Sequence, residues 1–208
     1  MEYGIRSGSL RKTKTRYFNI GYGSANYYLI DAGQHCLAVD VGWPGTINDY
    51  GRRLRPTGRK VQEVDYLIVT HFHVDHAGLV QELKNLGVRF VLLDVQVKHI
   101  AQMETFIQRK MSHDPINLKD STIITVAESR RFLNGIGIAG EVLHTPGHTD
   151  DSISVILDSG DAFVGDLRPE NQLAEDDAAS RSSWVKLRAL GARRVNPRHG
   201  NAFELLQS

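Results

Sequence analysis

The stretch Thr70-His71-Phe72-His73-Val74-Asp75-His76-Ala77-Gly78 places four metal-capable side chains within six positions, directly after an apolar run. The run at residues 64–69 predicts a buried strand, and extended backbone sends residues two apart to the same side. His71 and His73 can therefore converge on one metal ion. Asp75 and His76 lie where the chain turns into a predicted helix, face away from the first pair and can hold a second ion. Imidazole and carboxylate ligands favour zinc and leave iron and manganese open.

The length and charge of the chain restrict the kind of protein it can be. A chain of 208 residues is most simply one domain, 1–208, with a substantial core. Lysine plus arginine is 25 against 24 acidic residues, and the net charge of +1 argues against a dedicated nucleic-acid or membrane surface. Cys36 is the only cysteine, which excludes an intrachain disulfide and fits a reducing compartment. We therefore expect a cytoplasmic protein with a small-molecule substrate; a homo-oligomer stays open.

Hydrophobic patterning predicts the secondary structure of the first half of the chain. Three short strands are expected at residues 17–20, 26–30 and 36–41, a helix at 47–54 and a strand at 88–93. Val97, Ile100, Met103 and Ile107 recur at helical spacing and predict a further helix. A polar loop is expected at residues 108–120, and His99 and His113 are expected to be solvated.

The second half of the chain predicts more short strands and a last helix. We expect strands at residues 123–126, 131–133, 140–143, 153–157 and 162–164. The last helix is expected to start at Ser182 or Ser183 and to end at Gly191. The acidic segment before it, residues 168–183, is either a solvated connector or a flap over the metal site.

Three later residues can complete a metal centre, because each directly follows a predicted strand. They are His148, Asp166 and His199. Asp40 ends an earlier strand, where it either closes a turn or supports a metal ligand from behind. On the substrate side, Trp43 is either core cover or a pocket wall. Two further side chains, Arg168 and Arg198, would suit a carboxylate or phosphate of the substrate, unless they are simply solvated.

Together these residues resemble the metallo-β-lactamase fold superfamily, and the resemblance covers nearly the whole chain. The matching residues, in the order of that family, are Asp40, His71, His73, Asp75, His76, His148, Asp166 and His199. The resemblance implies an α+β fold, a four-layer αββα sandwich of two mixed β-sheets flanked by helices. It also implies a metal centre in which Asp166 bridges two ions; their other ligands would be His71, His73 and His148 for the first, and Asp75, His76 and His199 for the second.

The resemblance implies a dinuclear zinc hydrolase that uses a metal-bridging hydroxide, with Asp75 orienting it or carrying a proton to the leaving group. True β-lactamases of this fold usually have cysteine or serine in place of Asp166, so the resemblance places the chain nearer the thioesterase, lactonase and phosphodiesterase branches, and its ligand set resembles that of glyoxalase II. We therefore expect a small ester, thioester or lactone substrate. The alternatives are a mononuclear non-haem iron oxidoreductase like the persulfide dioxygenases, a phosphodiesterase of the same fold, and a binding module without catalysis.

Overall fold

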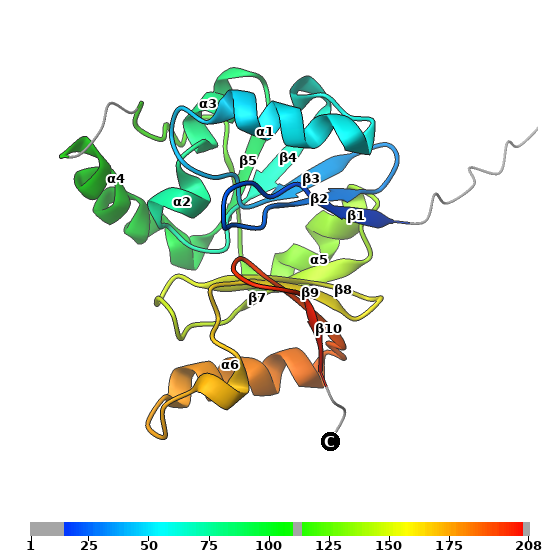
Figure 1. The fold of residues 1–208 in the computed structure, drawn as a ribbon, viewed down its shortest axis with the longest axis vertical. Helices are drawn as coiled ribbons and strands as arrows, with labels where there is room; N and C mark the ends of the chain where they lie inside the picture. Colours follow the sequence, from blue (N-terminus) through cyan, green and yellow to red (C-terminus); the bar gives the residue numbers. More distant parts are fainter. Residues whose placement is uncertain (1–14, 110–113, 206–208) are drawn as a thin grey trace, which may run out of the picture.

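Two β-sheets lie face to face between helices in the computed structural model, which describes residues 15–109 and 114–205 (Figure 1). The first sheet has the order β1-β2-β3-β4-β5-β6 and the second β11-β10-β9-β8-β7. The strands of the first sheet are β1 Arg16–Asn19, β2 Tyr28–Asp31, β3 Cys36–Val39, β4 Tyr66–Ile68, β5 Arg89–Leu93 and β6 Thr122–Ile124. Those of the second are β7 Gly140–His144, β8 Ile153–Leu157, β9 Asp161–Gly165, β10 Arg194–Pro197 and β11 Phe203–Glu204. Both sheets are mixed, since each contains parallel and antiparallel pairs.

Helices cover the outer face of each sheet. In Figure 1, α1 and α3 lie above the first sheet and α6 lies below the second. The α-helices are α1 Ile47–Leu54, α2 Val74–Ala77, α3 Val80–Asn85, α4 Ile100–Gln108, α5 Val126–Gly135 and α6 Ala178–Ala189. The short 3-10 helices are η1 Arg55–Thr57, η2 Val61–Glu63, η3 Asp94–His99 and η4 Glu170–Gln172. Among the described helices, none has the length and apolar character that crossing a membrane requires.

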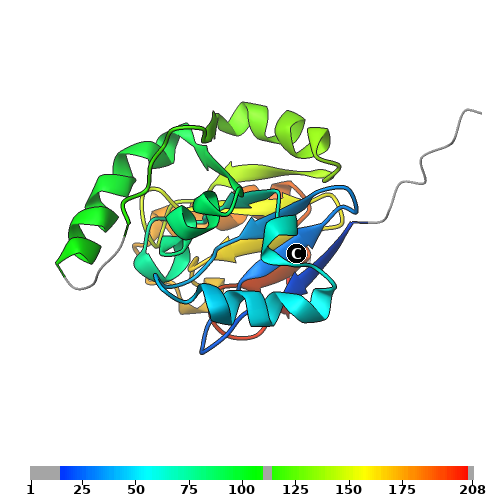
Figure 2. The same ribbon diagram turned by 90° about the horizontal axis from the view of Figure 1, so that it is seen from above.

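Three buried hydrophobic clusters separate the four layers. Alternate residues of each strand point to opposite faces of its sheet. In the first sheet, Leu29 and Ala38 pack toward the helices, whereas Ile30 and Leu37 pack between the sheets. In the second sheet, the side chains on the outer face pack against α6, including its fully buried Trp184. The predicted αββα sandwich of two mixed sheets is therefore confirmed, and Figure 2 shows the same stack from above.

The site lies where parallel strands end at one edge of the sandwich. Strands β3 and β4 run parallel, as do β9 and β10, so their carboxyl ends point the same way within each sheet. The segments after these strands hold Asp40, His71, Asp166 and His199. The connection between β7 and β8 adds His148. Residues far apart in the sequence are thus delivered to neighbouring strand ends.

The expected strand at residues 131–133 is wrong, because these residues lie within helix α5. The helix starts with a reciprocal capping pair. The backbone N–H of Thr125 donates to Glu128 Oε2 at 3.0 Å, and Thr125 Oγ1 accepts from the N–H of Glu128 at 3.3 Å. Such Thr-x-x-Glu pairs stabilise the first helical turn. Here the pair lies before residues 131–133, for which the sequence predicts a strand.

The last helix begins earlier than expected. Helix α6 starts at Ala178, and the carboxylate of Asp177 accepts a hydrogen bond from the N–H of Ser180 at 3.0 Å. The expected start at Ser182 or Ser183 is therefore wrong, since an aspartate N-cap satisfies the helix one turn earlier. Gly191 follows the helix with φ +81°, which fits its expected role at the end. Residues 110–113 of the expected polar loop, His113 among them, lie outside the described residues.

Candidate metal centre

Five segments at one edge of the sandwich bring the expected ligands together. His71 and His73 follow β4, and helix α2 carries Asp75 and His76. The other three follow or connect strands of the second sheet, namely His148, Asp166 and His199. Every residue expected from the sequence as a ligand therefore lies at this edge.

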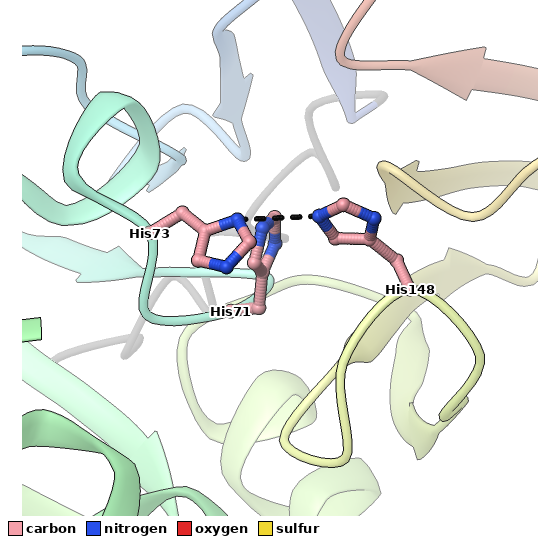
Figure 3. Close-up of side chains that lie close together, drawn as sticks. All are labelled: His71, His73 and His148. Atoms are coloured by element: carbon pink, nitrogen blue, oxygen red, sulfur yellow. Dashed lines mark hydrogen bonds between the residues drawn. The ribbon is translucent and has the colours of Figure 1, made fainter. Parts of the chain in front are cut away.

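Three histidines form a first group. The ligand nitrogens of His71, His73 and His148 lie within 4.8 Å of one another (Figure 3). His148 Nε2 is 3.2 Å from His73 Nδ1. Two nitrogens that share one tetrahedral zinc, at ~2.0–2.1 Å each, are roughly 3.3–3.4 Å apart. The spacing of these two rings therefore fits a common ion.

Two carboxylates and two histidines form a second group. His76 Nε2 lies 3.6 Å from Asp75 Oδ2 and 3.4 Å from Asp166 Oδ2. His199 Nε2 lies 3.9 Å from Asp75 Oδ2 and 3.8 Å from Asp166 Oδ1. Asp166 Oδ2 is also 3.5 Å from His148 Nε2 in the first group. The Asp166 carboxylate consequently contacts both groups.

Unsatisfied polar atoms in this cluster fit a metal. Three buried atoms have no hydrogen-bond partner among the described residues: His71 Nε2, His76 Nε2 and Asp166 Oδ1. Buried polar atoms in folded proteins are nearly always paired, so orphans that converge need another partner. A cation bound by imidazole nitrogens and carboxylate oxygens supplies it, and this donor set suits zinc, iron or manganese.

Asp40 lies behind His76 and fixes the orientation of its ring. Its buried carboxylate is 2.9 Å from His76 Nδ1 and accepts the backbone N–H of Thr70 at 2.7 Å. The backbone of Asp40 is left-handed, with φ +59°, a conformation that aspartate tolerates better than most residues. A hydrogen bond on Nδ1 leaves Nε2 for a metal, as is usual for liganding histidines.

The charges in the cluster leave metal-binding atoms available. Burial alone would lower the pKa of His76, but Asp40 and Asp166 raise it to about 9. Burial opposes ionisation of Asp166, yet the neighbouring histidines lower its pKa to about 2. Burial and the nearby histidines hold the pKa of His71 well below its usual value. At neutral pH, His71 is thus neutral and Asp166 ionised, and a metal at His76 would displace a proton.

A close approach of two strand ends requires glycine at position 165. Gly165 has φ +57°, and a Cβ there would lie 2.4 Å from Thr70 Oγ1. That distance is below any van der Waals contact and the atoms belong to a buried, hydrogen-bonded side chain. Glycine therefore lets the end of β9 bring Asp166 against the segment that carries His71.

Two cavities adjoin the cluster, and their linings share no residue. The first has a volume of about 610 Å³, and its lining includes His73 and Asp75 with the apolar residues Phe72, Met103 and Phe106. The second has a volume of about 510 Å³, and its lining includes His148, Asp166, Arg168 and His199. The lining of neither cavity includes Trp43, whose side chain is 44% exposed.

Arg198 does not occupy the position expected of a substrate-binding residue. Its side chain is 0% exposed and lies inside the protein. Nη2 donates to the hydroxyl of Tyr27 at 2.9 Å and to the backbone carbonyl of Asp75 at 2.8 Å. Because its guanidinium has no exposed surface, the expected contact with a substrate is replaced by contacts within the protein.

Other residues that hold the site were not singled out from the sequence. Asp151 Oδ2 accepts the backbone N–H of Phe72 at 2.7 Å, and Gln96 Nε2 donates to the carbonyls of Val69 and Asp151 at 3.1 and 3.2 Å. His99, expected to be solvated, lies 3.9 Å from Asp151 Oδ1 with 19% of its side chain exposed. The only hint in the sequence is that Asp151 lies in the same short loop as the expected ligand His148.

Relatives and solved structures resemble this chain over most of its length. A probable metallo-hydrolase of Methanocaldococcus jannaschii is 32% identical over 143 residues, covering 67% of this chain and 66% of the relative. A beta-lactamase-like protein 2 homolog of Drosophila melanogaster is 26% identical and covers 86% of this chain and 59% of its own length. The chain thus spans about six tenths to two thirds of the length of these two relatives.

Solved structures share the fold. A metallo-beta-lactamase family protein from Thermus thermophilus aligns with TM-score 0.66 and 22% identity, covering 91% of this chain and 74% of that one. A protein crystallised in a di-iron-bound form aligns with TM-score 0.68 and 22% identity, covering 90% and 94%. At these identities the likeness concerns the fold alone. The sequence profile of the metallo-beta-lactamase superfamily matches residues 20–199, which include all the clustered ligands. The chain therefore belongs to the metallo-beta-lactamase superfamily.

Proposed function

We propose that this protein is a dinuclear zinc hydrolase that cleaves a small ester, thioester or lactone. The observation that carries the proposal is the position of Asp166, whose Oδ2 lies 3.5 Å from His148 Nε2 and 3.4 Å from His76 Nε2. A carboxylate between two groups of ligands suits a bridge between two ions. The proposed ligands of the first ion are His71, His73 and His148, and those of the second Asp75, His76 and His199.

The chain's own residues then divide the remaining work. Bound zinc supplies a nucleophile at neutral pH, because it lowers the pKa of water from ~15.7 towards ~7. Asp75 lines the larger cavity beside the ligands, so its carboxylate can orient the nucleophile or pass a proton to the leaving group. No serine or cysteine nucleophile is needed, and Cys36 is buried elsewhere in the core.

The two cavities support a substrate with unlike ends. Phe72, Met103 and Phe106 give the first cavity an apolar wall, suited to an acyl group. Arg168 is exposed beside the second cavity and can attract a carboxylate or phosphate. A substrate that places its scissile bond at the ligands would direct its apolar part to Phe106 and an anionic part to Arg168.

Metal analysis and a substrate panel test the proposal. We expect two zinc ions per chain and turnover of at least one chromogenic thioester, ester or lactone. Asp75→Asn and Asp166→Asn should each lose 100-fold or more in kcat/KM. Asp158→Asn, which changes an exposed carboxylate paired with Arg130, should match the wild type. Full activity in both site variants would contradict the proposal, and turnover restricted to phosphodiesters would move it to the phosphodiesterase alternative.

A second candidate function uses iron. His71, His76 and Asp166 lie within 4.8 Å of one another and form a set of two histidines and one carboxylate, the set common to non-haem iron oxygenases. The di-iron-bound fold neighbour supports iron as a metal for this fold. One stoichiometric iron in protein purified without added metal, with oxygen uptake on a persulfide, would favour a persulfide dioxygenase-like oxidoreductase over the zinc hydrolase.

A further inference from the structure

Arg198 is a buried cation with too few partners to be explained by stability alone. Its side chain is 0% exposed, and its Nε and Nη1 have no hydrogen-bond partner among the described residues. Burying a charge is costly, and an ion pair in a protein interior repays that cost only when its hydrogen bonds are complete. A buried guanidinium with one bonded nitrogen therefore calls for a role beyond packing.

All the side-chain hydrogen bonds of Arg198 within the described residues are made by one nitrogen, Nη2, and they involve Asp75 and Tyr27. Nη2 donates to both the backbone carbonyl and Oδ2 of Asp75, at 2.8 and 3.2 Å, and to the hydroxyl of Tyr27 at 2.9 Å. The guanidinium also lies over the Tyr27 ring, with Cζ 4.2 Å from the ring centroid. The Tyr27 hydroxyl in turn donates to the carbonyl of Asp75 at 3.3 Å. Arg198 and Tyr27 thus converge on a single residue of helix α2.

The carboxylate oxygen of Asp75 that Arg198 contacts, Oδ2, is also the oxygen that faces the second ligand group. Asp75 Oδ2 lies 3.6 Å from His76 Nε2 and 3.9 Å from His199 Nε2. The backbone of Arg198 is itself fixed on both sides, since its N–H donates to Gly165 and its carbonyl accepts from Asn26. The side chain therefore starts from a rigid strand end and reaches a fixed point on Asp75.

We propose that Arg198, with Tyr27, is a positioning residue that holds the Asp75 carboxylate in place for the second metal ion. The inference rests on the proposed dinuclear centre. Partners that orient a ligand from behind contribute roughly 10–100-fold to metal affinity. Arg198 would act through Asp75 and would have little effect on the first ion, which the proposal assigns to His71, His73 and His148.

Stepwise cobalt and zinc binding separates the two ions. The variants are Arg198→Met, which removes the cation at similar length, Arg198→Lys, which keeps a charge without the planar fork, and Tyr27→Phe, which removes only the hydroxyl. We expect Arg198→Met to bind the first ion as the wild type does and the second 10–100-fold more weakly in chelator competition. Arg198→Lys and Tyr27→Phe should show smaller losses for the same ion, and the cobalt absorption bands should change only at the second equivalent.

Arg194→Met is the matched control, because Arg194 lies on β10, the strand that Arg198 directly follows, but is exposed and pairs with Glu204. It should bind both ions normally. If folded Arg198→Met, checked by circular dichroism, binds the second ion as tightly as the wild type or more tightly, the inference is overturned. Should that variant fail to fold, unchanged affinity in Tyr27→Phe and Arg198→Lys overturns it equally. If the wild type itself binds only one ion, the dinuclear proposal fails first and takes this inference with it.

Discussion

Replacing Asp40 by asparagine tests how the protein orients His76. The Asp40 side chain is 4% exposed, and its carboxylate lies 2.9 Å from His76 Nδ1 and accepts the Thr70 N–H at 2.7 Å. Asparagine keeps the size of the side chain and tolerates φ +59°, and its oxygen can still accept from Thr70. Its amide nitrogen cannot accept the hydrogen bond that His76 Nδ1 donates. One charge-assisted hydrogen bond is lost, which we expect to cost about 1.5–3 kcal/mol of unfolding free energy.

Replacing Asp40 by alanine removes more. The buried Thr70 N–H also loses its acceptor, and the left-handed backbone loses a side chain that tolerates it. We expect a total cost of about 4–7 kcal/mol. Urea denaturation of EDTA-treated protein measures both variants without a contribution from bound metal. Asp158→Asn, at an exposed ion pair with Arg130, is the control and should cost under about 1 kcal/mol.

The order of the three variants decides the outcome. We expect Asp40→Ala to be less stable than Asp40→Asn, and Asp40→Asn less stable than Asp158→Asn. Zinc affinity at the proposed second position should also fall by roughly 10–100-fold in Asp40→Asn. If Asp40→Asn is as stable as Asp158→Asn and binds zinc as the wild type does, then Asp40 merely closes a turn, and its contact with His76 has no role.

Three further predictions concern other parts of the fold. Burial opposes ionisation of Asp31, but hydrogen bonds from Arg59 and Gly33 outweigh it and lower its pKa, so the pair stabilises the fold above about pH 4 and less as the pH falls. Arg59→Met should therefore cost about 1–3 kcal/mol in urea at pH 7 and clearly less at pH 2.5; an equal cost at both would contradict this. Burial raises the pKa of the Cys36 thiol to about 11, so a disulfide reagent at pH 8 should label it only in urea. Asp177→Ala should cost about 1 kcal/mol through loss of the α6 cap, and Asp176→Ala under about 0.5 kcal/mol.

The ligands could be predicted because local order in the sequence determines their positions. His71, His73, Asp75 and His76 fall within six residues, and the alternation of an extended chain followed by a helix turn separates them into two groups. His148 and its two partners from the second sheet follow strands, and strand ends are where rigid scaffolds present side chains. Local patterns also predicted most of the strands and helices, whereas the sandwich of two sheets was implied by the resemblance to the superfamily.

The supporting residues could not be predicted, because their partners are far away in the chain. Arg198 and Asp75 are separated by 123 positions, and Asp151 and Phe72 by 79. A polar residue next to a strand looks the same in a sequence whether it is buried or solvated. Only the tertiary contact distinguishes them, so the sequence predicts neither the burial of Arg198 nor the contacts of Gln96. The strand expected at residues 131–133 and the late start expected for α6 are errors with a local cause instead, because Thr125 and Asp177 act as helix caps.

The protein supports the two halves of the centre unequally. Asp40 contacts His76 and Arg198 contacts Asp75, so buried charged side chains hold two members of the second group from behind. In the first group, His73 is exposed, and its ring lies beside those of His71 and His148. Positions held by buried contacts keep their geometry before a metal arrives, whereas exposed rings must give up rotamer freedom on binding. Within the second group, His76 and Asp75 are therefore preorganised, whereas the side chain of His199 is 51% exposed. Substitutions of Asp40 or Arg198 should accordingly weaken binding of the proposed second ion more than binding of the first.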